Sequence, residues 1–104
     1  MAINTQVRES VARISISGRF DFQLHREFKA AYTSLMDDAA VREIEVEMSK
    51  VDYLDSSALG MLMLLNERAK AAHKSITLLD ASSVVSQVLE VANFSRIFSI
   101  KRAS

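Results

Sequence analysis

The sequence predicts an α/β domain built on one mixed sheet of four to five strands, with the strands in sequential order and the helices mainly on one face. Segments with the hydrophobic period of a strand alternate along the chain with segments that have the period of a helix. In addition, residues 42–48 alternate strictly between polar and apolar side chains, whereas a parallel strand covered on both faces is a continuous apolar run. We therefore expect one bare sheet face, because right-handed crossovers between strands in chain order place every helix on the other face.

The first two strands are expected to form a hairpin, which makes the first strand antiparallel to the rest of the sheet. Residues 3–7 and 11–18 have the composition of strands, and residues 8–10 suit a tight turn although they lack an Asn-Gly or Gly-Gly pair. The second strand has an apolar and a polar face, with Ala12, Ile14 and Ile16 opposite Arg13, Ser15 and Ser17.

The first helix is expected to begin after Gly18-Arg19-Phe20-Asp21, with Asp21 as its N-cap. Its apolar stripe recurs at helical spacing and consists of Leu24, Phe28, Ala31 and Leu35. The strand predicted at residues 42–48 follows, with Ile44, Val46 and Met48 on one side and Glu43, Glu45 and Glu47 on the other.

The stretch from Val51 to Gly60 changes period and predicts the start of a second helix, which covers about residues 57–73. Asp55, Ser56 and Ser57 lie at the N-terminus of this helix, where their side chains can accept hydrogen bonds from the free N–H groups of the first turn. The helix dipole favours negative charge at this position. A serine placed here is therefore either a cap or a phosphorylation site.

The remaining elements complete the sheet. Residues 75–79 predict a fourth strand, residues 80–83 a helix start, and residues 97–100 a short edge strand. The third helix has an apolar face that consists of Val84, Val85, Val88, Leu89 and Ala92.

The composition is that of an ordinary globular protein, and we expect residues 1–104 to form a single domain. The chain has 49% hydrophobic and 25% charged residues, and its 13 basic residues balance its 13 acidic ones, which argues against nucleic acid or a membrane surface as a partner. The absence of cysteine excludes disulfides and thiolate metal sites. The longest apolar run is too short to span a bilayer and no signal peptide is visible, so we expect a cytoplasmic protein.

The sequence offers no set of residues for catalysis or for a cofactor. A serine hydrolase of the nucleophile-elbow type requires flanking glycines and a nearby histidine, whereas Ser56 lacks the glycines and His73 lies at the far end of the same helix. No histidine pair is spaced for a metal, and no glycine-rich loop is present for a phosphate group. Asp21, Asp52 and Asp55 could meet at the carboxyl edge of the sheet and bind a divalent ion. Helix capping explains Asp21 and Asp55 without one, so we expect no metal.

The outward face of the second helix carries exposed apolar residues. Leu64 is predicted to point away from the core, next to Gly60 and with Met63 at its shoulder. Gly60 costs about 1 kcal/mol of helix propensity while it removes a side chain beside the exposed leucine. This combination favours a surface for a partner protein over a plain solvated face.

Together these motifs resemble the anti-sigma factor antagonists of the STAS class. The matching motifs span essentially the whole chain and are Gly18-Arg19-Phe20-Asp21, Val51-Asp52-Tyr53-Leu54, Asp55-Ser56-Ser57-Ala58-Leu59-Gly60, Asn93-Phe94 and Ile97-Phe98. The resemblance implies a STAS-like fold. It also implies that Ser56, the first serine after the aspartate, is phosphorylated by a kinase that doubles as an anti-sigma factor. Asp21 matches the acidic residue near the phosphorylation site in that family, and Ala58 stands where glycine is frequent.

The resemblance further implies a partner switch. Unmodified protein would bind the anti-sigma factor/serine kinase and free the sigma factor, phosphorylation would end this binding, and a PP2C-type serine phosphatase would restore the active form. The expected partner-binding residues are Asp21, Asp55, Ser56, Ser57, Gly60, Met63 and Leu64. The same module occurs in anion transporters and stressosome assemblies, but the sequence shows no spanning segment or extra domain. A partner-switch protein with a client other than a sigma factor is the alternative.

Overall fold

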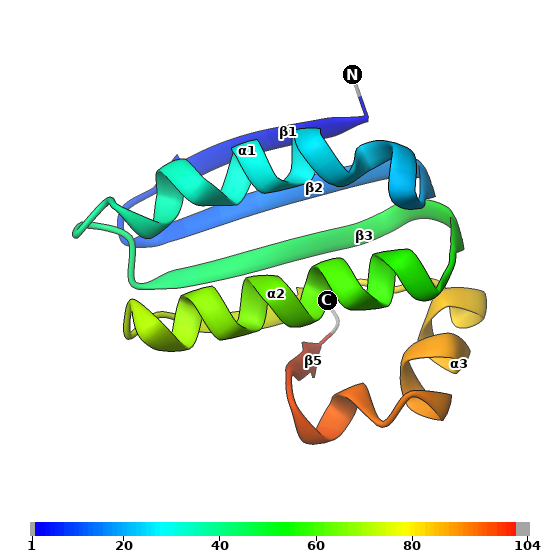
Figure 1. The fold of residues 1–104 in the computed structure, drawn as a ribbon. Helices are drawn as coiled ribbons and strands as arrows, with labels where there is room; N and C mark the ends of the chain where they lie inside the picture. Colours follow the sequence, from blue (N-terminus) through cyan, green and yellow to red (C-terminus); the bar gives the residue numbers. More distant parts are fainter. Residues whose placement is uncertain (1, 102–104) are drawn as a thin grey trace.

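A computed structural model, which describes residues 2–101, contains one five-stranded sheet whose strands follow one another in chain order (Figure 1). The strands are β1 (Ile3–Arg8), β2 (Val11–Phe20), β3 (Glu43–Leu54), β4 (Ser75–Leu79) and β5 (Ser99–Lys101). β1 is antiparallel to β2, and the other neighbouring pairs are parallel. The predicted fold class, with its sequential strand order and antiparallel first strand, is confirmed.

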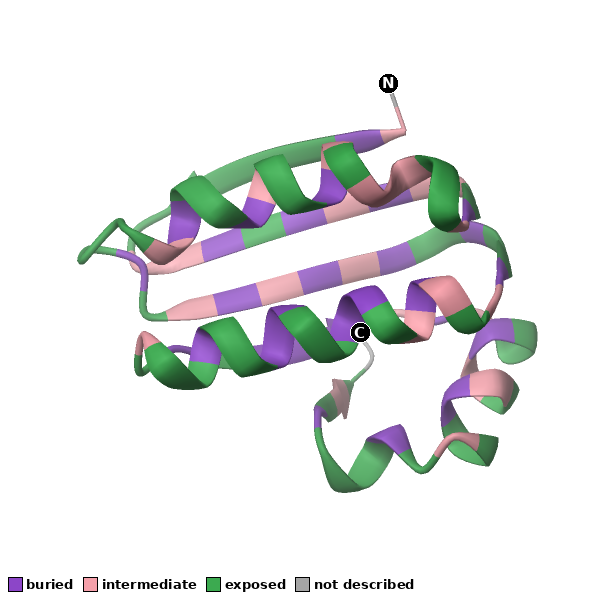
Figure 2. Ribbon diagram, in the orientation of Figure 1, coloured by how far each residue is buried: buried purple, intermediate pink, exposed green. Residues whose placement is uncertain are grey.

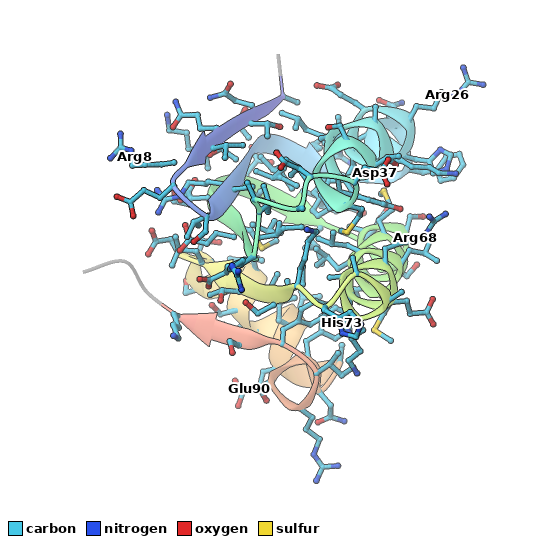
Figure 3. All side chains as sticks on the ribbon, turned by 90° about the vertical axis from the view of Figure 1, so that its left-hand side faces the viewer. Arg8, Arg26, Asp37, Arg68, His73 and Glu90 are labelled. Carbon is cyan, nitrogen blue, oxygen red and sulfur yellow. The ribbon has the colours of Figure 1, made fainter. Side chains whose placement is uncertain are left out.

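The helices are α1 (His25–Met36), α2 (Ser56–Ala71) and α3 (Ser83–Val91), with short 3-10 turns η1 (Phe22–Leu24) and η2 (Phe94–Arg96). α1 and α2 lie side by side on the same face of the sheet, and the view along them shows both helices to the right of the strands (Figure 3). α3 lies beyond the end of β4 (Figure 1). The predicted coverage of mainly one face is therefore confirmed.

The core lies between the sheet and the α1–α2 layer, and its residues come from the strand positions that the alternation predicted. Figure 2 shows buried positions that alternate with intermediate or exposed ones along β2 and along the first half of β3. The largest wholly buried side chains include Phe20 and Phe28, whose ring centroids are 5.2 Å apart, and Tyr32 packs edge-on against Phe28 at 5.5 Å. Glu43, Glu45 and Glu47 lie on the opposite, helix-free face, where Glu45 pairs with Arg13 at 3.0 Å.

β3 is longer than predicted, because the strand continues beyond Met48 to Leu54. β4 pairs with β3 only as far as Glu47, so the second half of β3 has no strand on that side and contacts α3 instead. Asp52 therefore lies inside β3, exposed, and not at a strand end. The predicted meeting of three carboxylates at one edge is wrong for Asp52.

The end of α2 is held by a buried lysine. His73, with φ of 60°, leaves the helix in the left-handed conformation, and the Lys74 N–H donates to the Ala69 carbonyl at 2.8 Å. The Lys74 ammonium then donates to the backbone carbonyl oxygens of Asp38 at 2.8 Å and Val41 at 2.6 Å. These bonds join the α2–β4 turn to the α1–β3 loop.

We expect Lys74→Met to lower the free energy of unfolding by about 2 kcal/mol, because it leaves one buried and one partly buried carbonyl oxygen without their charged donor. Urea denaturation measures the loss. Lys70→Met, at an exposed position in the same turn of chain, is the matched control and should change stability by less than about 0.5 kcal/mol. Equal losses in the two variants would show that the ammonium bonds contribute nothing specific.

Candidate functional site

The start of α2 is set by Asp55, as predicted. Asp55 has extended backbone angles, its Oδ1 accepts a hydrogen bond from the Ala58 N–H at 3.0 Å, and its carbonyl accepts from the Leu59 N–H at 3.2 Å. α2 therefore begins at Ser56, one residue before the predicted position. The first-turn N–H groups and the helix dipole make this place favourable for negative charge.

The two serines at this helix start differ in exposure. Ser56 is exposed, whereas Ser57 is half-buried. Successive residues of a helix are rotated by about 100°, so the two side chains point to different flanks of α2. In a helical-wheel projection of α2, Ser56 lies on the same flank as Met63. Ser57 lies on the same flank as Leu64, which faces α1.

Asp21 lies at the neighbouring strand end. Phe20 and Leu54 are partners across β2 and β3, so Asp21 and Asp55 follow adjacent ends of the sheet. Asp21 was predicted to cap the first helix, but it caps the short turn η1, and α1 begins three residues later than predicted, at His25. The Asp21 Oδ1 accepts a hydrogen bond from the Gln23 N–H at 3.0 Å. Both acidic residues are thus engaged with backbone N–H groups at the same edge.

A cation–aromatic contact beside this edge was not predicted from the sequence. The Arg19 guanidinium lies 4.0 Å from the centroid of the Tyr53 ring, and its Nε pairs with Asp21 Oδ2 at 3.4 Å. Arg19 and Tyr53 are partners in the β2–β3 register. Only that register brings them together, so sequence spacing alone carries no sign of it. Phe22 was also overlooked; it is 65% exposed and stacks on His25.

The outward residues of α2 lie on two flanks. Leu64 is 52% exposed and lines a groove of about 140 Å³ between α1 and α2, with the basic residues His25, Lys29 and Arg68 among its lining. Met63, 37% exposed, points toward the α3 side. Gly60 lies between these flanks, and a Cβ added there would meet no atom within 4 Å. The predicted exposure of all three residues is confirmed, whereas their role in binding stays a prediction.

The α3 side carries a second, shallow and apolar groove. It is lined by Leu59, Val84, Gln87, Val88, Val91 and Ala92. Val84 was expected in the buried face of the third helix but is 62% exposed. The reason is that α3 packs against the free half of β3 instead of lying over the sheet, so only the side with Val85 and Leu89 is covered.

The titratable side chains that the structure places at this helix start are those of Asp21 and Asp55, both used as caps. His73 lies just beyond the opposite end of α2 from Ser56. Within residues 2–101, no three or more of the usual acidic or histidine ligands lie close enough to hold a metal ion. Of the helices in the described part of the chain, none combines the length and apolar composition of a membrane span.

The comparisons with known proteins agree with this architecture. The family model described as "Mlab, STAS domain" matches residues 3–100. A STAS-domain containing protein of Pseudomonas aeruginosa (strain UCBPP-PA14) is 40% identical over 87 residues, which are 84% of this chain and 84% of that protein.

Among solved structures, the anti-sigma factor antagonist SpoIIAA in its unphosphorylated form superposes with a TM-score of 0.79 at 19% identity, covering 99% of this chain and 90% of that one. The Bacillus cell fate determinant SpoIIAA in its phosphorylated form gives 0.78 at 18% identity, covering 99% and 92%. At these identities the structures show a shared fold.

We expect Asp55→Ala to lower the free energy of unfolding by about 1 kcal/mol, because the Ala58 N–H loses its side-chain acceptor. Chemical denaturation measures this change. Asp55→Asn is the control, since an amide oxygen can accept the same hydrogen bond. If Asn were as destabilising as Ala, the contribution of Asp55 would come from its charge near the helix dipole and not from capping.

Proposed function

The chain belongs to the STAS domain family, and we propose that it is an anti-sigma factor antagonist whose partner binding is controlled by phosphorylation of Ser56. In this proposal the unmodified protein binds an anti-sigma factor that is also a serine kinase, and the sigma factor is released. Phosphorylation ends the binding, and a PP2C-type serine phosphatase reverses it. The observation that carries the proposal is the exposed Ser56 hydroxyl at the first residue of α2, directly after the capping Asp55.

The position of Ser56 suits a charge switch. A phosphoserine carries about −1.5 to −2 charges, and the N-terminus of a helix stabilises an anion through its free N–H groups and its dipole. The phosphate would add to the charge of Asp55 and of Asp21 at the adjacent strand end. A coupling of about 3 kcal/mol between phosphorylation and partner binding would change affinity roughly 150-fold, which is enough for a switch.

We expect the fold to survive this modification. The two forms of SpoIIAA, unphosphorylated and phosphorylated, superpose on this chain equally well, with TM-scores of 0.79 and 0.78. Both forms of that protein therefore share the fold of this chain. In this chain the loss of binding would come from charge and bulk at the surface and not from unfolding of α2.

The partner surface in this proposal is centred on the start and outward face of α2. It consists of Asp21, Asp55, Ser56, Ser57, Gly60, Met63 and Leu64. Leu64 supplies an apolar contact in the groove, and the basic side chains of His25 and Arg68 that line the groove favour an acidic group next to the apolar anchor of the partner. The protein acts by binding and not by catalysis, as one cytoplasmic STAS domain over residues 1–104.

A client other than a sigma factor is the second candidate. It is compatible with the matching family model, whose description, "Mlab, STAS domain", identifies the domain and not its client. Affinity purification of the chain from its own cells, before and after phosphatase treatment, distinguishes the two. A sigma-binding kinase recovered only with dephosphorylated protein supports the first candidate, and a switchable partner that binds no sigma factor supports the second.

Incubation with the cognate kinase should place phosphate on Ser56, which peptide mapping detects. The modified protein should lose partner binding in a titration, while its helicity and thermal transition stay nearly unchanged, because repulsion from Asp55 in water costs only about 1 kcal/mol. Loss of helicity together with binding would show that the switch works by unfolding.

Single substitutions provide the controls for this experiment. Ser56→Ala should prevent the modification, Ser56→Glu should mimic it in part, and Ser57→Ala should still be phosphorylated. Phosphate found only on Ser57 would contradict the assignment.

Leu64→Glu should weaken binding of the kinase by about 2 kcal/mol or more, as expected for an interface hot spot, and should leave stability within about 0.5 kcal/mol. Isothermal titration and thermal melts measure the two quantities. Ala30→Glu, which adds the same charge at an exposed position of α1, is the control. A large fall in melting temperature for Leu64→Glu would mean that Leu64 is a core residue.

A further inference from the structure

The outer edge of β1 is an unpaired strand edge of six residues, Ile3–Arg8. β1 pairs with β2 alone, and Asn4, Thr5, Gln6, Val7 and Arg8 are all exposed (Figure 2). β5, at the other edge, spans the three residues Ser99–Lys101 within the described part of the chain. An open strand edge offers a row of backbone N–H and C=O groups for pairing with another chain.

The register of the hairpin identifies which backbone groups point outward. The Ser17 N–H donates to the Ala2 carbonyl at 2.8 Å, and Ile3 faces Ile16. In an antiparallel pair, hydrogen-bonded and non-hydrogen-bonded positions alternate. The even-numbered residues of β1 therefore bond to β2, and the N–H and C=O groups of Ile3, Thr5 and Val7 point away from the sheet.

β1 lacks the features that usually protect such an edge. Natural edges carry lysine, proline, bulges or inward charges that prevent pairing. Among the residues of β1 only Arg8, at its end, is charged and none is proline, and the β1–β2 register runs without a shift. Val7, in addition, leaves an apolar side chain 51% exposed.

We propose that β1 pairs with β1 of a second copy of this chain, antiparallel, about a two-fold axis that is perpendicular to the sheet and passes beside Thr5. This axis keeps the helices of both copies on the same face. In the register with Thr5 opposite Thr5 of the second copy, Ile3 lies opposite Val7, and all outward N–H and C=O groups of these residues are paired in about six hydrogen bonds. The two sheets become one.

The side chains are compatible with this register. Asn4 faces Gln6 of the second copy and Arg8 faces Ala2, so no like charges are opposed. On the flank of α1 turned away from α2, the small side chains Ala31 and Ser34 leave room, and the longer Glu27 lies between them. The paired surface is small, which predicts a weak, concentration-dependent dimer. The dimer does not involve the start of α2 and is independent of the proposed function.

The position of Thr5 on the axis allows a specific test. Thr5→Lys places two like charges opposite each other in the dimer, and so does Thr5→Glu, whereas an equimolar mixture of the two variants opposes unlike charges. Sedimentation equilibrium up to millimolar concentration should show a dimer for the unaltered chain, monomer for each variant alone, and recovery of the dimer in the mixture. Thr33→Lys and Thr33→Glu, on the exposed side of α1, should behave like the unaltered chain.

A cysteine scan gives a second measurement, because the chain has no cysteine of its own. Cα atoms of a hydrogen-bonded antiparallel pair are about 5.5 Å apart, which a disulfide can span. Thr5→Cys should therefore form a covalent dimer on oxidation, and Gln6→Cys, which faces position 4, should not. A monomer at every concentration, a dimer that persists in Thr5→Lys alone, or equal cross-linking at both positions would overturn the proposal.

Discussion

The hydrogen bond from the Ala58 N–H to the Asp55 carboxylate sets the phase of α2, and the exposure of Ser56 depends on it. With Asp55 as cap, Ala58 and Leu62 are placed in the core and are fully buried. The helical rotation then turns Ser56 outward. The cap also uses the aspartate to satisfy one N–H, so the serine hydroxyl is not required for capping and stays accessible.

Strand length determines what surrounds this helix start. β3 extends to Leu54, whereas β4 ends opposite Glu47, so α3 packs against the second half of β3. On the other side of β3, Asp21 and η1 follow directly after the end of β2. The start of α2 therefore lies between the polar sheet edge with Asp21 and the apolar groove on α3. One flank of the helix faces a charged group and the other faces apolar side chains.

The alternation of Ile44, Val46 and Met48 with glutamates was sufficient to predict the bare face of the sheet, because a regular strand has a period of two. The same rule placed the end of this strand at Met48, whereas β3 continues to Leu54. Between β2 and β3 the register shifts twice, and each shift gives β3 an extra residue, which is a β-bulge. After Met48 the buried positions of β3 are Val51 and Leu54, at a spacing of three. Period-two analysis cannot follow such a segment, so it misplaced Asp52 and overlooked the contact of Tyr53 with Arg19. The exposure of Val84 could not be predicted from the sequence either. An apolar helix face shows which side of α3 can be buried, but not how much of that side the sheet covers.

If Ser56 is the proposed switch, the two flanks of α2 restrict how a partner can recognise it. Ser56 and Met63 fall on one flank, Leu64 falls on the other, and Gly60 lies between them at the crest of the helix. A partner that contacts both Ser56 and Leu64 must cross the crest at Gly60, where nothing projects from the backbone. A side chain there would hold the partner away from both flanks, so the glycine compensates its cost of about 1 kcal/mol in helix propensity by allowing close contact. In the proposed function, charge added at Ser56 acts at the edge of that contact, where the partner would exclude water and electrostatic repulsion would be stronger than in solution.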